Sequence, residues 1–124
     1  METPHRPATI LVVEDEPLIA LDIEESLVEL GLAVRLARSL AEARDALAIE
    51  PAPDLVLLDV VLPDGRSFDL AREILAKDVP LVFLTGYDQG IPEDFGAVTV
   101  IDKPFSTEAL LAAVGWLAGG RQEH

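Results

Sequence analysis

Five carboxylate side chains stand beside apolar runs of this chain, where they could bind a metal ion and a phosphoryl group. They are Glu14, Asp15, Glu16, Asp59 and Asp102. The first three follow the apolar run 10–13, Asp59 follows the run 55–58, and Asp102 precedes the chain's Lys103-Pro104 step. Carboxylate oxygens bind hard cations such as Mg²⁺, and a lysine can neutralise a phosphoryl oxygen. These residue types therefore indicate a metal and phosphoryl site.

The four most apolar runs are expected to deliver these side chains to one edge of a sheet. The runs are 10–13, 55–58, 79–84 and 98–101, and Thr85 directly follows the third of them. Buried strands of a parallel sheet have continuous apolar sequences, and ligands bind outside the carboxyl ends of such strands. The acids, the threonine and the lysine are therefore predicted to meet there.

The elements that must position these side chains alternate between strand and helix. Helices are predicted over 17–30, 39–50, 67–77 and 106–117, and Phe68, Ala71 and Leu75 are expected to face the core from the third. The run 33–37 alternates between apolar and polar residues, so we place it at the sheet edge. This pattern predicts an α/β fold: a doubly wound, flavodoxin-like, five-stranded parallel sheet with strand order 2-1-3-4-5.

Composition and charge exclude several classes of protein. Of 124 residues, 50% are hydrophobic, which suffices for one core, and we expect a domain over 8–118 with tails at 1–7 and 119–124. No apolar stretch reaches the length of a membrane span, no cysteine is present, and no signal-peptide pattern opens the chain. A net charge of −14 argues against nucleic-acid binding. We expect a soluble, cytoplasmic protein.

The ordered set of motifs resembles the receiver domains of two-component response regulators, over about residues 8–118. The matching motifs are Glu14-Asp15, Asp59, Pro63-Asp64-Gly65, Thr85 and Lys103-Pro104-Phe105. Each motif alone is weakly specific, but together at four successive strand ends they are strongly specific. The resemblance implies that Asp59 is the phosphoacceptor, and that Thr85 and Lys103 contact the phosphoryl oxygens. It also implies a cis Lys103-Pro104 bond, which turns the lysine into the site.

The metal that suits this chemistry is Mg²⁺, because an anionic nucleophile and an anionic phosphoryl group need positive charge between them. Asp15 and Asp59 are expected as direct ligands, and Glu14 is expected to act through a water. The resemblance adds the backbone carbonyl of Val61 as a further ligand. These residues could instead have only structural roles. The acids 14–16 could be charges favoured by a helix amino terminus, and Lys103 could be a simple salt-bridge partner of Asp59.

Two features depart from the commonest receiver pattern. Val100 occupies the strand position where most receivers carry an aromatic switch residue, and the strand end 83–86 reads Phe-Leu-Thr-Gly. Both features resemble a subgroup of stand-alone receivers. The segment 86–96 contains Gly86, Gly90, Pro92 and Gly96, which disfavour a regular helix, so the fourth helix is predicted to be short or irregular. We hypothesise that contact of Thr85 with a phosphoryl group orders this segment.

The resemblance implies a response regulator that takes a phosphoryl group from a histidine kinase or phosphotransfer protein and acts on a protein target or as a phosphate sink. Only 119–124 follows the last predicted helix, so we expect action by association and no catalysis beyond its own phosphorylation and dephosphorylation. One alternative is a receiver-like scaffold that is never phosphorylated. The other is a phosphatase of the haloacid dehalogenase type, but Val61 stands where that family needs an acid.

Overall fold

Five parallel strands form the central sheet, in the order β2-β1-β3-β6-β7. The computed structural model describes residues 7–86 and 90–119. The five strands are β1 (Thr9–Val13), β2 (Ala33–Ala37), β3 (Leu55–Asp59), β6 (Leu81–Thr85) and β7 (Thr99–Asp102). This order confirms the predicted topology, with β2 at an edge. The predicted tails lie almost entirely outside the described residues.

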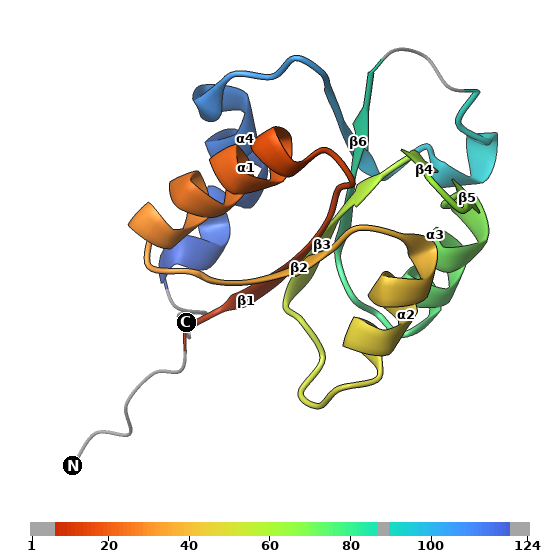
Figure 1. Ribbon diagram of the computed structural model, residues 1–124, viewed down its shortest axis with the longest axis horizontal. Coiled ribbons are helices and arrows are strands. Elements are labelled where there is room, and N and C mark those ends of the chain that lie inside the picture. The colour runs from red at the N-terminus through yellow and green to blue at the C-terminus, as the bar shows by residue number, and fades with distance from the viewer. Residues whose placement is uncertain (1–6, 87–89, 120–124) are drawn as a thin grey trace.

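Helices cover both faces of the sheet (Figure 1). One layer contains α1 (Pro17–Glu29) and α4 (Thr107–Val114), and the other contains α2 (Leu40–Leu47) and α3 (Phe68–Ala76). Each layer closes over its own apolar cluster, because alternate residues of each central strand point to opposite faces. The 3₁₀ turn η2 (Gly115–Gly119) continues α4. The predicted helices are thus confirmed, with the last one ending as a 3₁₀ turn.

The third helix turns the predicted face to the core and buries two further residues. Ala71 is fully buried, and Phe68 and Leu75 are partly buried against the core cluster, as expected. Leu70 and Ile74, which the prediction did not include, are also fully buried on α3. Phe68 lies in an aromatic cluster with Phe83 and Phe95, their ring centroids lying 5.1 to 6.0 Å apart.

A short hairpin that the sequence did not predict follows the end of β3. It pairs β4 (Val61–Leu62) with β5 (Gly65–Arg66), and Asp64 lies in its turn. Gly65 has φ +138°, a backbone conformation that favours glycine, and an added Cβ would lie 3.4 Å from Leu40 Cδ1. Asp64 accepts hydrogen bonds from the backbone N–H groups of Leu40 (2.8 Å) and Ala41 (3.1 Å). The hairpin is therefore tied to the amino terminus of α2.

We expect an Asp64→Ala variant to unfold at a lower temperature than the wild type, because it leaves two amino-terminal N–H groups of α2 without this acceptor. The backbone hydrogen bonds from Leu40 and Ala41 hold the pKa of Asp64 below its ordinary value. A lowered pKa stabilises the fold above the unfolded pKa, and that contribution is lost as pH falls through the folded pKa. The difference in melting temperature between the wild type and Asp64→Ala should be largest at neutral pH and should become smaller in acid. A difference that does not change with pH would contradict this role of Asp64.

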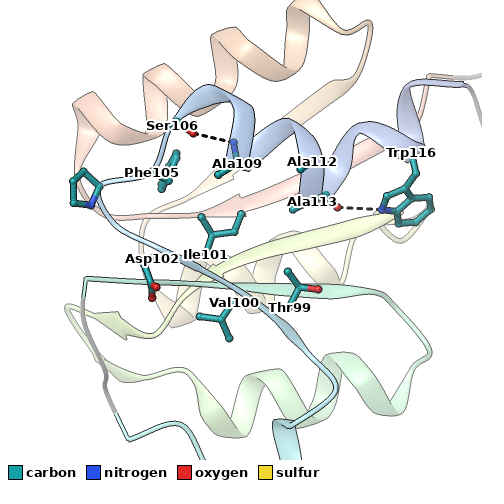
Figure 2. Close-up of a pocket in the computed structure, with 11 residues that line it drawn as sticks. Thr99, Val100, Ile101, Asp102, Phe105, Ser106, Ala109, Ala112, Ala113 and Trp116 are labelled. Atoms are coloured by element: carbon teal, nitrogen blue, oxygen red, sulfur yellow. Dashed lines mark hydrogen bonds between the residues drawn. The ribbon is translucent and has the colours of Figure 1, made fainter.

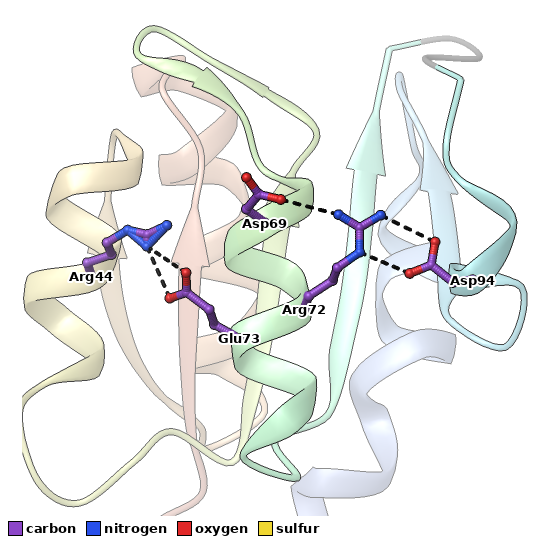
Figure 3. A network of polar contacts seen from close by, with 5 residues as sticks. All are labelled: Arg44, Asp69, Arg72, Glu73 and Asp94. Carbon is purple, nitrogen blue, oxygen red and sulfur yellow. Dashed lines mark hydrogen bonds and ion pairs between the residues drawn. The ribbon is translucent and has the colours of Figure 1, made fainter.

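Between β6 and β7, the described residues contain only the 3₁₀ turn η1 (Glu93–Phe95). This confirms the prediction of a short or irregular fourth helix for the part of the segment that the structure describes. Arg72 of α3 holds the turn, donating from Nε and Nη2 to the two carboxylate oxygens of Asp94 at 3.0 and 3.3 Å (Figure 3). Its guanidinium also lies 5.0 Å from the ring centroid of Phe95. A second pair, Arg44 with Glu73, joins α2 to α3.

None of the helices in the described part of the chain has the length and apolar character needed to cross a lipid bilayer.

Candidate functional site

The carboxyl ends of β1, β3, β6 and β7 bring most of the predicted site residues together. The parallel register sets Val13 beside Leu58, Asp59 beside Leu84, and Thr85 beside Asp102. Chain segments that follow these strands therefore leave the sheet at the same edge. Glu14, Asp59 and Thr85 are buried there, at 1%, 5% and 2% exposure, and Asp15 is half-buried. Burial of so many polar groups is costly unless they are paired or bind a cation.

Lys103 is the cation that the described residues place in this cluster. Its Nζ donates a hydrogen bond to Asp59 Oδ2 at 2.9 Å and lies 2.6 Å from Glu14 Oε1. Glu16 Oε1 is farther away, at 3.9 Å, and its side chain is exposed. The Lys103 side chain is only 13% exposed. One ammonium group thus joins the carboxylates that follow β1 and β3.

The backbone holds Lys103 in this position. The Lys103 N–H donates to the Thr85 carbonyl at 2.6 Å, and the Lys103-Pro104 bond is cis, as the resemblance implied. Thr85 and Lys103 therefore occupy neighbouring strand ends, and both lie at the edge that carries Asp59. The structure brings together all the residues that were predicted to contact a phosphoryl group.

The charges of the cluster act on one another. Burial raises the pKa of the Glu14 carboxyl above its ordinary value, and Lys103 opposes that rise only in part. Burial alone would lower the pKa of Lys103, but contacts with Glu14 and Asp59 outweigh it and raise the pKa above its ordinary value. Lys103 therefore remains a cation, and the site gathers more negative charge than one lysine neutralises.

The carboxylates have the arrangement that a hard metal ion needs. One oxygen each from Glu14, Asp15 and Asp59 lie within 4.8 Å of one another. Glu14 Oε1 is fully buried and lies 2.6 Å from Lys103 Nζ, its ion-pair partner. The three carboxylates carry more negative charge than the single ammonium group of Lys103 can neutralise. The residues therefore fit Mg²⁺, with Glu14 expected to act through a water.

Asp102 does not join the other acids, although it stands next to Lys103 in the chain. Its side chain is exposed and lines a groove of about 910 Å³ between β7 and α4 (Figure 2). Val100 and Trp116 border the same groove, 40% and 59% exposed. Trp116 Nε1 donates to the Ala113 carbonyl at 3.1 Å and so lies along the surface of the helix. The groove is an accessible surface adjoining the Lys103-Pro104 step.

One buried polar residue at this edge was not identified from the sequence as part of the site. Ser67 is fully buried, and its Oγ donates to the backbone carbonyl of Asp59 at 2.7 Å. In the sequence, Ser67 reads only as the start of a helix. The signal is absent from the sequence because the partner is a backbone atom eight residues away, which only the folded loop brings close.

Comparisons with known proteins agree with this geometry. The family model of the response regulator receiver domain matches residues 10–115. Transcriptional regulatory protein PdtaR of Mycobacterium tuberculosis is 37% identical over 118 residues, which cover 87% of this chain and 55% of PdtaR. The chain therefore spans about half the length of this curated relative.

Solved receiver structures share the whole fold. The non-phosphorylated HemR receiver domain of Leptospira biflexa superposes with a TM-score of 0.77 at 34% identity, covering 96% of this chain and 99% of that one. The PhyR receiver domain of Erythrobacter litoralis gives a TM-score of 0.75 at 29% identity, with 95% of each chain covered. With the family model, the topology and the strand-end residues in agreement, the chain belongs to the receiver domain family of two-component response regulators.

Proposed function

We propose that this receiver domain accepts a phosphoryl group on Asp59 in a Mg²⁺-dependent reaction. Receiver domains take phosphate from histidine kinases or phosphotransfer proteins, and we propose such a protein as the donor here. The observation that carries the proposal is the 2.9 Å hydrogen bond from Lys103 Nζ to Asp59 Oδ2 inside a buried acidic cluster. A lysine held in that position contacts the nucleophile and can stabilise the negative charge that develops on the phosphoryl oxygens during transfer.

The transfer itself is a substitution at phosphorus. A carboxylate oxygen of Asp59 forms a bond to phosphorus while the bond from phosphorus to the donor's imidazole nitrogen breaks. That nitrogen leaves with the electron pair and takes up a proton. Lys103 neutralises one phosphoryl oxygen, and the Thr85 hydroxyl donates a hydrogen bond to another. The reacting oxygens are thereby oriented and their negative charge is reduced.

Mg²⁺ would be held by Asp15, Asp59 and the Val61 carbonyl, with Glu14 acting through a water. When bound, it supplies the positive charge that lets an anionic carboxylate approach an anionic phosphoryl group. The support in this chain is the close spacing of three carboxylates beside a single ammonium group, that of Lys103.

Intact mass after incubation with acetyl phosphate and Mg²⁺ tests the proposal. The wild type should gain one phosphoryl group, whereas Asp59→Asn and a chelator-treated sample should gain none. Asp102→Asn is the matched control, because it neutralises a carboxylate at the same edge that lies outside the cluster. A wild type that stays folded and binds Mg²⁺ but gains no mass would instead favour the unphosphorylated scaffold.

We further propose that the phosphorylated domain passes its signal by association with a protein target, or drains phosphate from its kinase. Its catalysis would be confined to its own phosphorylation and dephosphorylation. The β7–α4 groove supports the first route, since it offers exposed Val100 and Trp116 beside the strand that carries Lys103. The regulation of transcription that PdtaR's name describes belongs to that longer protein.

A further inference from the structure

Three helices of the described chain begin after a serine, but these serines do not act alike. Ser39 Oγ accepts from the Glu42 N–H at 3.1 Å, and Ser106 Oγ accepts from the Ala109 N–H at 3.0 Å. Both are ordinary amino-terminal caps, in extended backbone conformation. Ser67 makes no such bond and has φ −95° and ψ 12°. Its hydroxyl is used for something other than capping α3.

The hydroxyl of Ser67 binds the backbone of the proposed nucleophile. Ser67 Oγ donates to the Asp59 carbonyl at 2.7 Å, and Ser67 N–H donates to the Val60 carbonyl at 3.0 Å. The β1–β3 pairing ends at Val13 and Leu58, so the Asp59 carbonyl lies beyond the last pair of that ladder. Ser67 thus binds the Asp59 carbonyl on the side where β1 no longer pairs with β3, while β6 still pairs with Asp59 on the other side.

The peptide group between Asp59 and Val60 is consequently held from both sides. Its carbonyl accepts from Ser67 Oγ, and its N–H donates to the Leu84 carbonyl at 3.0 Å. Two bonds on opposite sides fix the plane of a peptide group, and this plane sets the direction in which the Asp59 side chain leaves the backbone. Ser67 is fully buried, so water does not compete for the bond.

We propose that Ser67 is a positioning residue for phosphoryl transfer, acting through the backbone of Asp59. By holding the carbonyls of residues 59 and 60, it orients the Asp59 carboxylate toward Lys103 and fixes the start of the turn that carries Val61. This inference rests on the proposed function of Asp59. A misplacement of about 1 Å at a reacting group can slow a reaction by about a hundredfold, so one backbone bond at this point can matter for rate.

The test compares Ser67→Ala with Ser39→Ala, which removes the same hydroxyl from a serine that only caps a helix. In Ser67→Ala we expect the maximal rate of phosphorylation by acetyl phosphate to fall by about tenfold or more, with little change in the half-saturating donor concentration. Ser39→Ala should lose stability but keep the wild-type rate. Ser67→Thr, which restores the hydroxyl, should recover much of the rate.

Two further readouts do not depend on phosphorylation. Hydrogen exchange at the Val60 amide should be faster in Ser67→Ala than in Ser39→Ala, because one side of its peptide group is released. Mg²⁺ affinity, measured by calorimetry, should fall by about tenfold, as is usual when a group that orients metal ligands is removed. If Ser67→Ala does not fold, Ser67→Cys takes its place, since it keeps a side chain of similar size with a much weaker donor.

The outcomes separate this inference from the function on which it rests. If the wild type is phosphorylated and folded Ser67→Ala reacts as fast as Ser39→Ala, the positioning role is wrong and Asp59 remains the acceptor. If the wild type gains no phosphoryl group, the proposed function fails. The positioning role of Ser67 is then tested by hydrogen exchange at the Val60 amide and by Mg²⁺ affinity alone. If neither differs between Ser67→Ala and Ser39→Ala, the inference is overturned.

Discussion

A Lys103→Met variant is expected to lose about 3 kcal/mol of its unfolding free energy in the presence of a chelator, the lower end of the cost of breaking a buried ion pair. Met keeps an unbranched apolar side chain as far as Cε and removes the charged ammonium group. Glu14 and Asp59 would then share a buried site with no cation between them, at 0% and 8% side-chain exposure. Urea denaturation in chelator, with the slope compared between variants, measures the loss.

Mg²⁺ should restore most of that stability, because a bound cation gives the carboxylates a new partner and stabilises only the folded state. Phosphorylation by acetyl phosphate should nevertheless remain slower by about a hundredfold, since the phosphoryl oxygen that Lys103 neutralises would stay uncompensated. Lys77→Met is the matched control, because Lys77 is exposed at the end of α3. Equal stability of the two variants in chelator would show that Lys103 does not hold the acidic cluster together.

The site residues that could be predicted from the sequence are those at the ends of the central strands. Continuous apolar runs revealed the central strands. The polar residues directly after three of these runs are Glu14, Asp59 and Thr85, and Lys103 stands two positions after the fourth. The parallel register then brings these side chains close together, because the carboxyl ends of neighbouring strands lie at one edge of the sheet. Asp102 is the exception: it ends β7, yet its side chain is exposed in the groove.

Features that depend on tertiary partners were not predictable in the same way. Ser67, Ser39 and Ser106 look alike in sequence, and only the position of the Asp59 carbonyl separates the first from the other two. Phe68 fits the apolar period of its helix and was placed correctly, but one of its aromatic partners, Phe95, comes from an irregular segment whose sequence has no period to read. Helical periodicity therefore predicted the core-facing side of α3 but not every residue buried there.

Phe95→Ala is expected to cost about 3 to 5 kcal/mol of unfolding free energy, the range for removing a buried phenyl ring. Phe95 is 3% exposed, and its ring makes an edge-on contact with Phe83 at 5.1 Å between centroids. Arg72→Ala should cost much less, because Arg72 and Asp94 are both largely exposed and water screens their attraction. If both variants lost the same stability, Arg72 would contribute as much as the buried ring to holding the η1 turn, which would contradict this expectation.

Phe95 also limits where phosphorylation can change the segment after β6. The backbone bonds from Phe95 N–H to the Pro92 carbonyl and from Val98 N–H to the Phe95 carbonyl surround this buried ring. If contact of Thr85 with a phosphoryl group orders the segment, we expect beryllofluoride, a phosphoryl mimic, to slow amide exchange at residues 90–92 and to change little at 93–98. Identical exchange with and without the mimic would contradict the ordering hypothesis.

In Phe95→Ala the same mimic should slow amide exchange across all of residues 90–98. The buried Phe95 ring would no longer hold residues 93–98 in place before the mimic binds. Phosphorylation of Asp59 itself should proceed at close to the wild-type rate wherever the variant is folded, since Phe95 packs within an apolar cluster and supplies no group to the acidic one. A rate that fell with the loosened segment would instead mean that the η1 turn helps to build the site. The two measurements together distinguish a segment that responds to the phosphoryl group from one that the site needs in order to react.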